Sequence, residues 1–397
     1  MENINTNRLF LASYLALITT AMTFAIRARL ETVFGPEGVG LTLEQIGYAF
    51  TPAFFGFILA MIFGGPLEDF LGIKKITWIA FVTHAIGIVW AIITNSISSL
   101  FLATLFVGIG IGMVKAALNP MIASIYTDEK TKMLNRFHVW FPGGIVIGAI
   151  VGWLIMDVVG QSWQIMVATL FIPLIIYGIL FYGQKFPVTE RIQMGISNKK
   201  MFTSIGKPLF LFTVFCMFLK SSSELGTKQR IESLLKESVA VPLLVLAFIN
   251  GIMALGRQFA GPVAHKLKPA GMLLYSAIFT FIGLCLLTIT SGEMTFITAA
   301  VFAIGVTFFW PTMLGYIAEY LPETRALGLS IMGGAGMFSV SLVLLIMGKL
   351  MDNVNATEAF RTMSILPEIL IIAFIGLNIY MKKEVKQNNY NFICLEN

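Results

Sequence analysis

Ionisable side chains interrupt several long apolar stretches of this 397-residue chain. Lys115 and Asn119 lie four residues apart in one stretch, and Lys220 and Glu224 lie four apart in another. Residues at this spacing share one face of an α-helix. A charge in the middle of a membrane helix costs on the order of 3 kcal/mol, so it normally faces a cavity or a partner. Lys115 has no acid three or four residues away, which predicts that it faces a cavity and binds a ligand.

Further polar and aromatic residues extend this candidate site. Thr20, Thr23 and Arg27 share a helical face, and Asn135 and His138 lie three residues apart. Trp140 and Trp310 stand next to prolines that kink helices, where a ring can stack on a sugar face. The predicted substrate-binding residues are Arg27, Lys115, Asn119, Asn135, His138, Trp140, Lys220 and Trp310, with Glu224 as the protonatable coupling group.

Each of these assignments has a structural alternative. Lys220 and Glu224 could be a pair that only neutralises itself, and Arg27 could reach the outer headgroups of a membrane. Packing between helices is an equally good explanation of the two tryptophans.

The composition shows which elements must position these side chains. Hydrophobic residues make up 57% of the chain and charged residues 12%, with a mean hydropathy of +0.84, whereas soluble domains carry about 25% charged residues. We therefore predict an all-α integral membrane protein with twelve transmembrane helices. The expected spans are 9–30, 46–66, 76–94, 99–122, 134–156, 164–182, 208–226, 241–262, 271–290, 294–317, 327–349 and 364–381.

Enzymatic motifs are missing from the sequence. Neither Gly-Lys pair is followed by Ser or Thr, as a phosphate-binding loop requires, and no two histidines have the spacing of a zinc protease. The three cysteines show no paired spacing. We predict no enzyme, no catalytic residue, no metal and no cofactor.

Basic residues predict the orientation. With both termini in the cytoplasm, most Lys and Arg fall in inner loops, and seven fall outside: Arg27, Arg29, Lys228, Arg230, Lys236, Lys349 and Arg361. Such a bias is typical of cytoplasmic termini. Topology then explains the net charge of +6, and no nucleic-acid partner is expected.

A polar, basic segment at 183–207 divides the chain into two halves. Similar signals recur across it in order: Gly65-Pro66 and Gly261-Pro262, Pro120 and Pro311, and Gly143-Gly144 and Gly333-Gly334. This pattern predicts a duplicated six-helix unit. The expected domains are an N-terminal half at 1–182, a cytoplasmic linker at 183–207, a C-terminal half at 208–381 and a cytoplasmic tail at 382–397.

The turn GGPLEDFLGIKK at 64–75 resembles the signature loop of the major facilitator superfamily. The resemblance implies a twelve-helix carrier with a gate at this turn. Arg257 belongs to GRQFAGPVAHKLKP at the end of the eighth span, where Gly261-Pro262 matches Gly65-Pro66 of this turn. Expected gating residues are Gly65, Asp69, Gly72, Lys74, Lys75 and Arg257. The alternative is a turn that only ends two helices.

Several motifs resemble the fucose permease-like branch of that superfamily, among them GIGMVKAALNP in the fourth span and Trp310-Pro311-Thr312 in the tenth. Lys115 and Ala28 stand where that branch has acidic residues. The resemblance implies symport of a sugar or acidic sugar derivative with a proton or sodium ion. It also implies a monomer in the lipid bilayer of a bacterial inner membrane. An exporter of amphipathic or drug-like compounds is the alternative.

Overall fold

The computed structural model describes residues 4–35, 38–189, 198–235 and 242–395, and these are helical with short turns. The first group of helices is α1 (Thr6–Phe34), α2 (Leu43–Phe50), α3 (Pro52–Leu71), α4 (Ile73–Ile92), α5 (Ile97–Ile125), α6 (Lys130–His138), α7 (Trp140–Trp153), α8 (Trp163–Ala168) and α9 (Phe171–Phe181). A π-helical turn, η1 (Leu154–Val158), follows α7.

The second group begins after α11 (Asn198–Ser204). It contains α12 (Pro208–Ser221), the π turn η2 (Ser222–Gly226), α13 (Thr227–Leu235), α14 (Pro242–Gln258), α15 (Ala260–Leu287), α16 (Met294–Thr307), α17 (Phe309–Tyr320), the 3₁₀ turn η3 (Pro322–Thr324), α18 (Arg325–Asn353), α19 (Ala356–Met363) and α20 (Ile365–Leu395).

Eleven helical segments in the described part of the chain are long and apolar enough to cross a membrane, and Leu244–Gln258 is a shorter apolar helix. The helix of α14 resumes at Ala260 and runs to Lys268, whose φ of 57° and ψ of 166° break α15 into two helices. Residues 242–267 therefore make the eighth span, which is interrupted once. The predicted fold class, an all-α membrane protein of about twelve spans, is confirmed.

Large apolar side chains cover the outside of this bundle. Phe55, Phe63, Phe70, Ile172 and Leu255 are each more than half exposed. Such a surface is costly in water and favourable against lipid tails. The chain is a multi-pass membrane protein.

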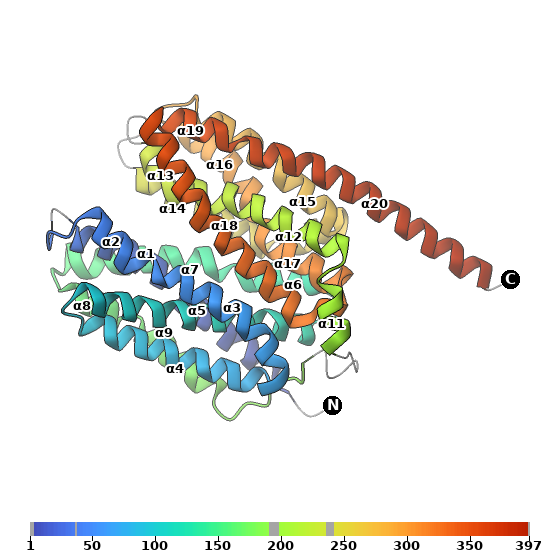
Figure 1. Cartoon of the computed structure of the whole chain (residues 1–397), viewed down its shortest axis with the longest axis horizontal. Helices are drawn as coiled ribbons and strands as arrows, with labels where there is room; N and C mark the ends of the chain where they lie inside the picture. Colours follow the sequence, from blue (N-terminus) through green and yellow to red (C-terminus); the bar gives the residue numbers. More distant parts are fainter. Residues whose placement is uncertain (1–3, 36–37, 190–197, 236–241, 396–397) are drawn as a thin grey trace.

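The helices form two groups that meet along a central seam. In Figure 1, α1, α3, α4, α5 and α9 lie in one group and α12, α15, α16, α18 and α20 in the other, and α1 begins at the end of the bundle where α20 finishes. Across the seam α3 packs on α18, α7 on α14, and α6 on α17. The domain boundaries given above and the duplication stay predictions.

Two glycines allow the closest approach across the seam. A Cβ on Gly65 of α3 would lie 3.0 Å from the Ala326 carbonyl oxygen and closer still to the side chain of Ser330, both on α18. A Cβ on Gly315 of α17 would lie 2.8 Å from Thr131 Cα of α6. Small residues at these crossings let the two backbones touch.

Candidate functional site

Charged side chains meet at the seam, midway along the spanning helices. Lys115 of α5 is 4% exposed, Lys220 of α12 is 0% exposed, and Glu224 of η2 is 2% exposed. Burial of this kind requires a partner for each charge. The structure therefore brings together three residues that the sequence singles out.

Three cations surround the Glu224 carboxylate. Its Oε2 is 2.6 Å from Lys220 Nζ, and its Oε1 is 3.5 Å from Lys228 Nζ and 4.0 Å from Arg257 Nη2. Both lysines are four residues from Glu224, so one helical face presents them to it. The π turn that carries Glu224 is a local irregularity of a kind often found at functional sites.

Lys228 was missed by the sequence analysis. The seventh span was expected to end at residue 226, so Lys228 was placed in an outer loop. This placement was wrong, because the apolar helical segment extends to Ile231. The helix continues through α13, where the Lys228 side chain is 8% exposed and lies 3.4 Å from Asn250 Oδ1. The signal was in the sequence: Lys220, Glu224 and Lys228 follow one another at intervals of four.

Aromatic rings surround Lys115. Its Nζ is 4.3 Å from the ring centroid of Phe141, 5.0 Å from that of Trp310 and 5.5 Å from that of Phe57. The Trp310 ring is also 4.4 Å from Lys220 Nζ, so it lies between two lysines. Ring faces attract cations. No described carboxylate forms an ion pair with Lys115. The electron-rich faces of these rings are therefore the main groups that stabilise its positive charge.

Arg257 connects the cluster to both helix groups. Its Nη1 donates to the His138 carbonyl oxygen at 3.0 Å, and its Nε donates to the Thr307 carbonyl oxygen at 2.6 Å. His138 ends α6 in the first group, while Thr307 ends α16 in the second. The sequence assigned Arg257 to the gate, and the structure places it both in the charged cluster and across the seam.

The predicted polar residues of α5 and α6 lie buried at the same seam. Asn135 Nδ2 donates to Thr312 Oγ1 of α17 at 3.3 Å, and His138 Nδ1 lies 2.9 Å from the Leu134 carbonyl oxygen. Among the Asn, His and Trp side chains predicted to bind substrate at this seam, four buried atoms have no hydrogen-bond partner in the described part of the chain: Asn119 Oδ1, Asn135 Oδ1, His138 Nε2 and Trp310 Nε1. Each such atom costs about 1–3 kcal/mol unless water or a ligand bonds it.

Two predicted site residues lie elsewhere. Arg27 is near the end of α1, where its Nε is 3.8 Å from Glu31 Oε1 and its guanidinium stacks on Phe24 and Phe54. It lines a mostly apolar pocket of about 660 Å³, whose walls come from the first helix group and from Met337 of α18. Trp140 packs on Tyr14 with ring centroids 5.6 Å apart. The neighbouring residue, Phe141, faces Lys115 in its place.

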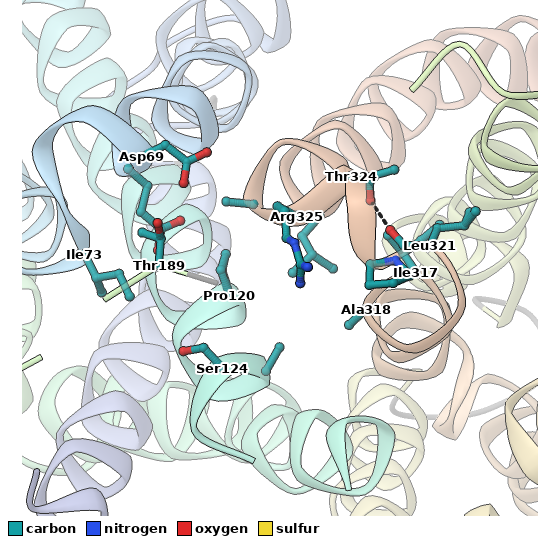
Figure 2. Close-up of a pocket in the computed structure, with 15 residues that line it drawn as sticks. Asp69, Ile73, Pro120, Ser124, Thr189, Ile317, Ala318, Leu321, Thr324 and Arg325 are labelled. Carbon is teal, nitrogen blue, oxygen red and sulfur yellow. Dashed lines mark hydrogen bonds between the residues drawn. The ribbon is translucent and has the colours of Figure 1, made fainter. Parts of the chain in front are cut away.

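The signature turn lies at the end of the bundle where α1 begins. Asp69 is 4% exposed and lines a pocket of about 400 Å³ with Arg325 at the start of α18. Figure 2 shows their side chains coming from opposite sides of this pocket. Gly72 has a φ of 82°, which glycine adopts without strain, and it lets the chain reverse from α3 into α4. Lys74 and Lys75 are exposed.

A second contact closes the same end of the seam. Lys130 Nζ donates to the Ala318 carbonyl oxygen at 3.3 Å, and the Thr131 amide donates to Glu319 Oε1 at 2.8 Å. These bonds join α6 of the first group to α17 of the second. We propose that these two contact regions, α3 with α18 and α6 with α17, form a gate, and we call them the inner gate. The helices touch at both regions in this structure, which is the closed arrangement of such a gate.

Replacing Asp69 by Asn is expected to weaken the closed gate while leaving ligand binding intact. The change keeps the size of the side chain and removes its charge, and interactions of charged groups contribute about 1.5–3 kcal/mol. The ratio of open to closed gate should rise by about tenfold or more. Cysteine labelling at the inner end and transport turnover would measure this change. Unchanged transport would leave the turn with a structural role alone.

A bundle of membrane helices with a buried, charged site between two helix groups is typical of a secondary transporter. A family model described as Major Facilitator Superfamily matches residues 9–252, and the chain belongs to this superfamily, which is one of transporters rather than enzymes. The predicted family is confirmed.

Known structures match over nearly the whole chain. FucP, a superfamily transporter solved in the outward conformation, has a TM-score of 0.77 at 17% identity over 94% of this chain and 98% of its own. The proton:xylose symporter XylE, bound to 6-bromo-6-deoxy-D-glucose, has 0.77 at 14% identity, over 92% and 94%. The human organic anion transporter MFSD10 has 0.72 at 12% identity, over 94% and 100%. These similarities show that the chain has the fold of these transporters, and the expected resemblance to FucP is among them.

Among curated sequences, a di-/tripeptide transporter of Lactococcus lactis subsp. cremoris is 29% identical over 105 residues. The match covers 26% of this chain and 21% of that transporter. The chain therefore spans about a fifth of the length of this relative.

Proposed function

We propose that this protein is a secondary active transporter that moves a sugar or an acidic sugar derivative by alternating access. The observation that supports it is the cluster at the seam, in which Lys220, Lys228 and Arg257 surround a single carboxylate, Glu224. A fourth cation, Lys115, shares the Trp310 ring with Lys220. The cations belong to both helix groups, so a ligand that binds them touches both sides of the seam. Closing around such a ligand is what alternating access requires.

The charge balance favours an anionic substrate. Four cations and one carboxylate leave three positive charges in a region of low dielectric constant, where like charges repel strongly. A carboxylate or phosphate group on the substrate would reduce this repulsion. Lys115 is the principal counter-charge in this proposal because it has no carboxylate of its own in the structure.

The rest of the site suits a sugar ring. Trp310, Phe141 and Phe57 offer ring faces that can stack on the apolar face of a sugar. The unbonded polar atoms of Asn119, Asn135 and His138 can bond hydroxyl groups. We assign no such role to Trp140, whose ring packs on Tyr14.

Ion coupling follows from an exchange of partners at Glu224. Without substrate, Glu224 neutralises part of the charge on Lys220, Lys228 and Arg257. When an anionic substrate pairs with these cations, their hold on Glu224 weakens, and protonating its carboxylate becomes less costly. The outer aqueous phase supplies this proton. Substrate and proton then cross together, and Glu224 releases the proton inside.

A binding screen followed by uptake tests this function. Purified protein is screened by thermal shift against neutral hexoses, hexuronates and sialic-acid-like compounds, and the best ligand is tested in proteoliposomes. We expect a hexuronate or sialic-acid-like compound to stabilise the protein and to show saturable uptake driven by an ion gradient. Flux that does not saturate would indicate a channel and overturn the proposal.

The runner-up function is export of amphipathic compounds. The apolar pocket around Arg27 is the observation that favours it, because its aromatic wall and single guanidinium suit an apolar body with an acidic group. Stabilisation by amphipathic acids, with no response to any sugar or uronate, would favour this function over sugar transport.

We also propose the bacterial inner membrane as the location, with both termini in the cytoplasm and a monomer as the working unit. On this orientation the inner gate faces the cytoplasm, and a closed inner gate belongs to the outward-facing state.

Cysteine labelling tests the orientation. In a background with the native cysteines replaced, a membrane-impermeant reagent added outside should label Val39→Cys and Asn355→Cys, and should leave Thr203→Cys unlabelled. All three positions are exposed in the structure. Lysis of the cells should then make Thr203→Cys reactive. The reverse pattern would invert the topology.

A further inference from the structure

Glu68, next to the signature aspartate, is an acidic residue that the transport proposal does not use. It lies in the last turn of α3 with 0% of its surface exposed, and it lines the pocket of the inner gate. Neither carboxylate oxygen has a hydrogen-bond partner in the described part of the chain. No ion pair within 4.0 Å joins it to a described cation.

The helices around this pocket bring few charges to Glu68. Asp69 is adjacent on α3 and is itself acidic, and Arg325 of α18 lines the same pocket without forming an ion pair with Glu68. On α4, Lys74 and Lys75 are exposed rather than lining it. The pocket residues of α5 are uncharged, and Ser124 is the polar one among them.

Two acids of the neighbouring elements α17 and η3 have partners of their own. Glu319 of α17 accepts a hydrogen bond from the Thr131 amide at 2.8 Å. Glu323 of η3 pairs with Lys200 at 2.9 Å and with Lys207 at 2.6 Å. Glu68 differs from both, because it is fully buried and has no such bond.

An ionised carboxylate in this position would be costly. Burying an unpaired charge carries a penalty of several kcal/mol even after the protein relaxes, and the neighbouring Asp69 adds like-charge repulsion. Binding a proton removes both costs, since a neutral carboxylic acid is far cheaper to bury.

We propose that Glu68 is a proton-binding site of the inner gate, protonated while the gate is closed and ionised when the gate opens and water enters the pocket. The proton comes from water on the inner side when the gate closes and returns to the same side when it opens. Glu68 therefore sets the equilibrium of the gate and carries no charge across the membrane. The inner side is the cytoplasm in the orientation proposed above.

The sign of the pH effect follows from proton linkage. The closed gate binds one more proton than the open gate, so raising the pH on the inner side favours opening. One proton corresponds to a change of up to about tenfold in the open-to-closed ratio per pH unit. This effect needs no substrate, so it can be measured whatever the protein transports.

Spin labels across the inner end measure the gate directly. Tyr182→Cys after α9 and Lys266→Cys in α15 are exposed positions in different helix groups. In lipid nanodiscs without substrate, the wild-type distance distribution should shift toward the open gate as pH rises. Glu68→Gln mimics the protonated acid and should stay closed at every pH. Glu129→Gln, a change at an exposed acid on the same end, should behave as wild type.

Two results would overturn the proposal: a wild-type gate that does not respond to pH, or a Glu68→Gln gate that keeps the wild-type response. A second measurement does not depend on the folding of that variant. Infrared difference spectra of the wild type between low and high pH should contain a carbonyl band of a buried protonated acid, and Glu68→Asp should shift it. Spectra of a folded Glu68→Asp protein with the wild-type band unchanged would also refute it.

Discussion

Replacing Glu224 by Gln is expected to destabilise the protein by about 3–5 kcal/mol, the cost of removing one partner from a buried ion pair. The carboxylate lies 2.6 Å from Lys220 and is also close to Lys228 and Arg257. Without it, three buried cations repel one another with no counter-charge. Thermal or denaturant unfolding in a single mild detergent would measure the loss.

Two controls separate this effect from a general response to losing an acid. Asp157→Asn breaks an ion pair with Arg29 in which the Arg29 side chain is 38% exposed and the Asp157 side chain 42% exposed. Because this pair is exposed, its loss should lower the free energy of unfolding by at most about 1 kcal/mol. The double change Glu224→Gln with Lys220→Met removes one of the unpaired cations and should recover part of the stability. A Glu224→Gln protein as stable as the wild type would show that the carboxylate does not balance these cations.

Replacing Lys115 by Gln is expected to weaken binding of an anionic substrate by about 2–5 kcal/mol, the cost of truncating one partner of a buried charge pair. Lys115 is the cation of the cluster that lies among aromatic rings and has no carboxylate of its own. The loss should therefore appear in substrate affinity rather than in stability. Titration calorimetry with the best ligand of the screen would measure it.

Lys349→Gln is the matched control, because this lysine is exposed on α18 and should leave affinity unchanged. Equal affinities of Lys115→Gln and wild type for the anionic ligand would remove Lys115 from the site. Addition of free anions of the same charge should compete with the ligand in the wild type.

Composition was enough to predict the fold because a membrane imposes it. Apolar stretches of about 20 residues must be helical to satisfy their backbone groups in lipid, and all twelve expected spans correspond to helical segments. The ends of the helices were harder to place. Polar residues at a helix end look like a loop when that end is buried in protein, and this is why Lys228 was assigned to the outside.

Contacts between distant helices could not be read from spacing. The four-residue interval of Lys220 and Glu224 predicts their pairing, and the structure has it. Nothing local relates Arg257 to Glu224 or to His138, since these contacts depend on how α14 crosses α7 and α12. For the same reason Trp140 was predicted to line the site although Phe141 contacts Lys115. Adjacent residues of a helix point about 100° apart, and spacing alone does not say which of the two faces the seam.

The inner gate shows a similar limit. The signature motif drew attention to Asp69, and the adjacent acid, Glu68, has no motif of its own. Its interest comes from full burial without a partner, which only the packing of α3 against α5 and α18 reveals.

The most direct test of the proposed site compares a neutral sugar with its acid. Glucose and glucuronate share a ring and differ in one carboxylate, so their binding to the wild type by titration calorimetry isolates the effect of substrate charge. We expect glucuronate to bind at least tenfold more tightly, and Lys115→Gln to abolish this difference. Tight binding of glucose, with no preference for glucuronate and no change in Lys115→Gln, would contradict an anion site at the seam.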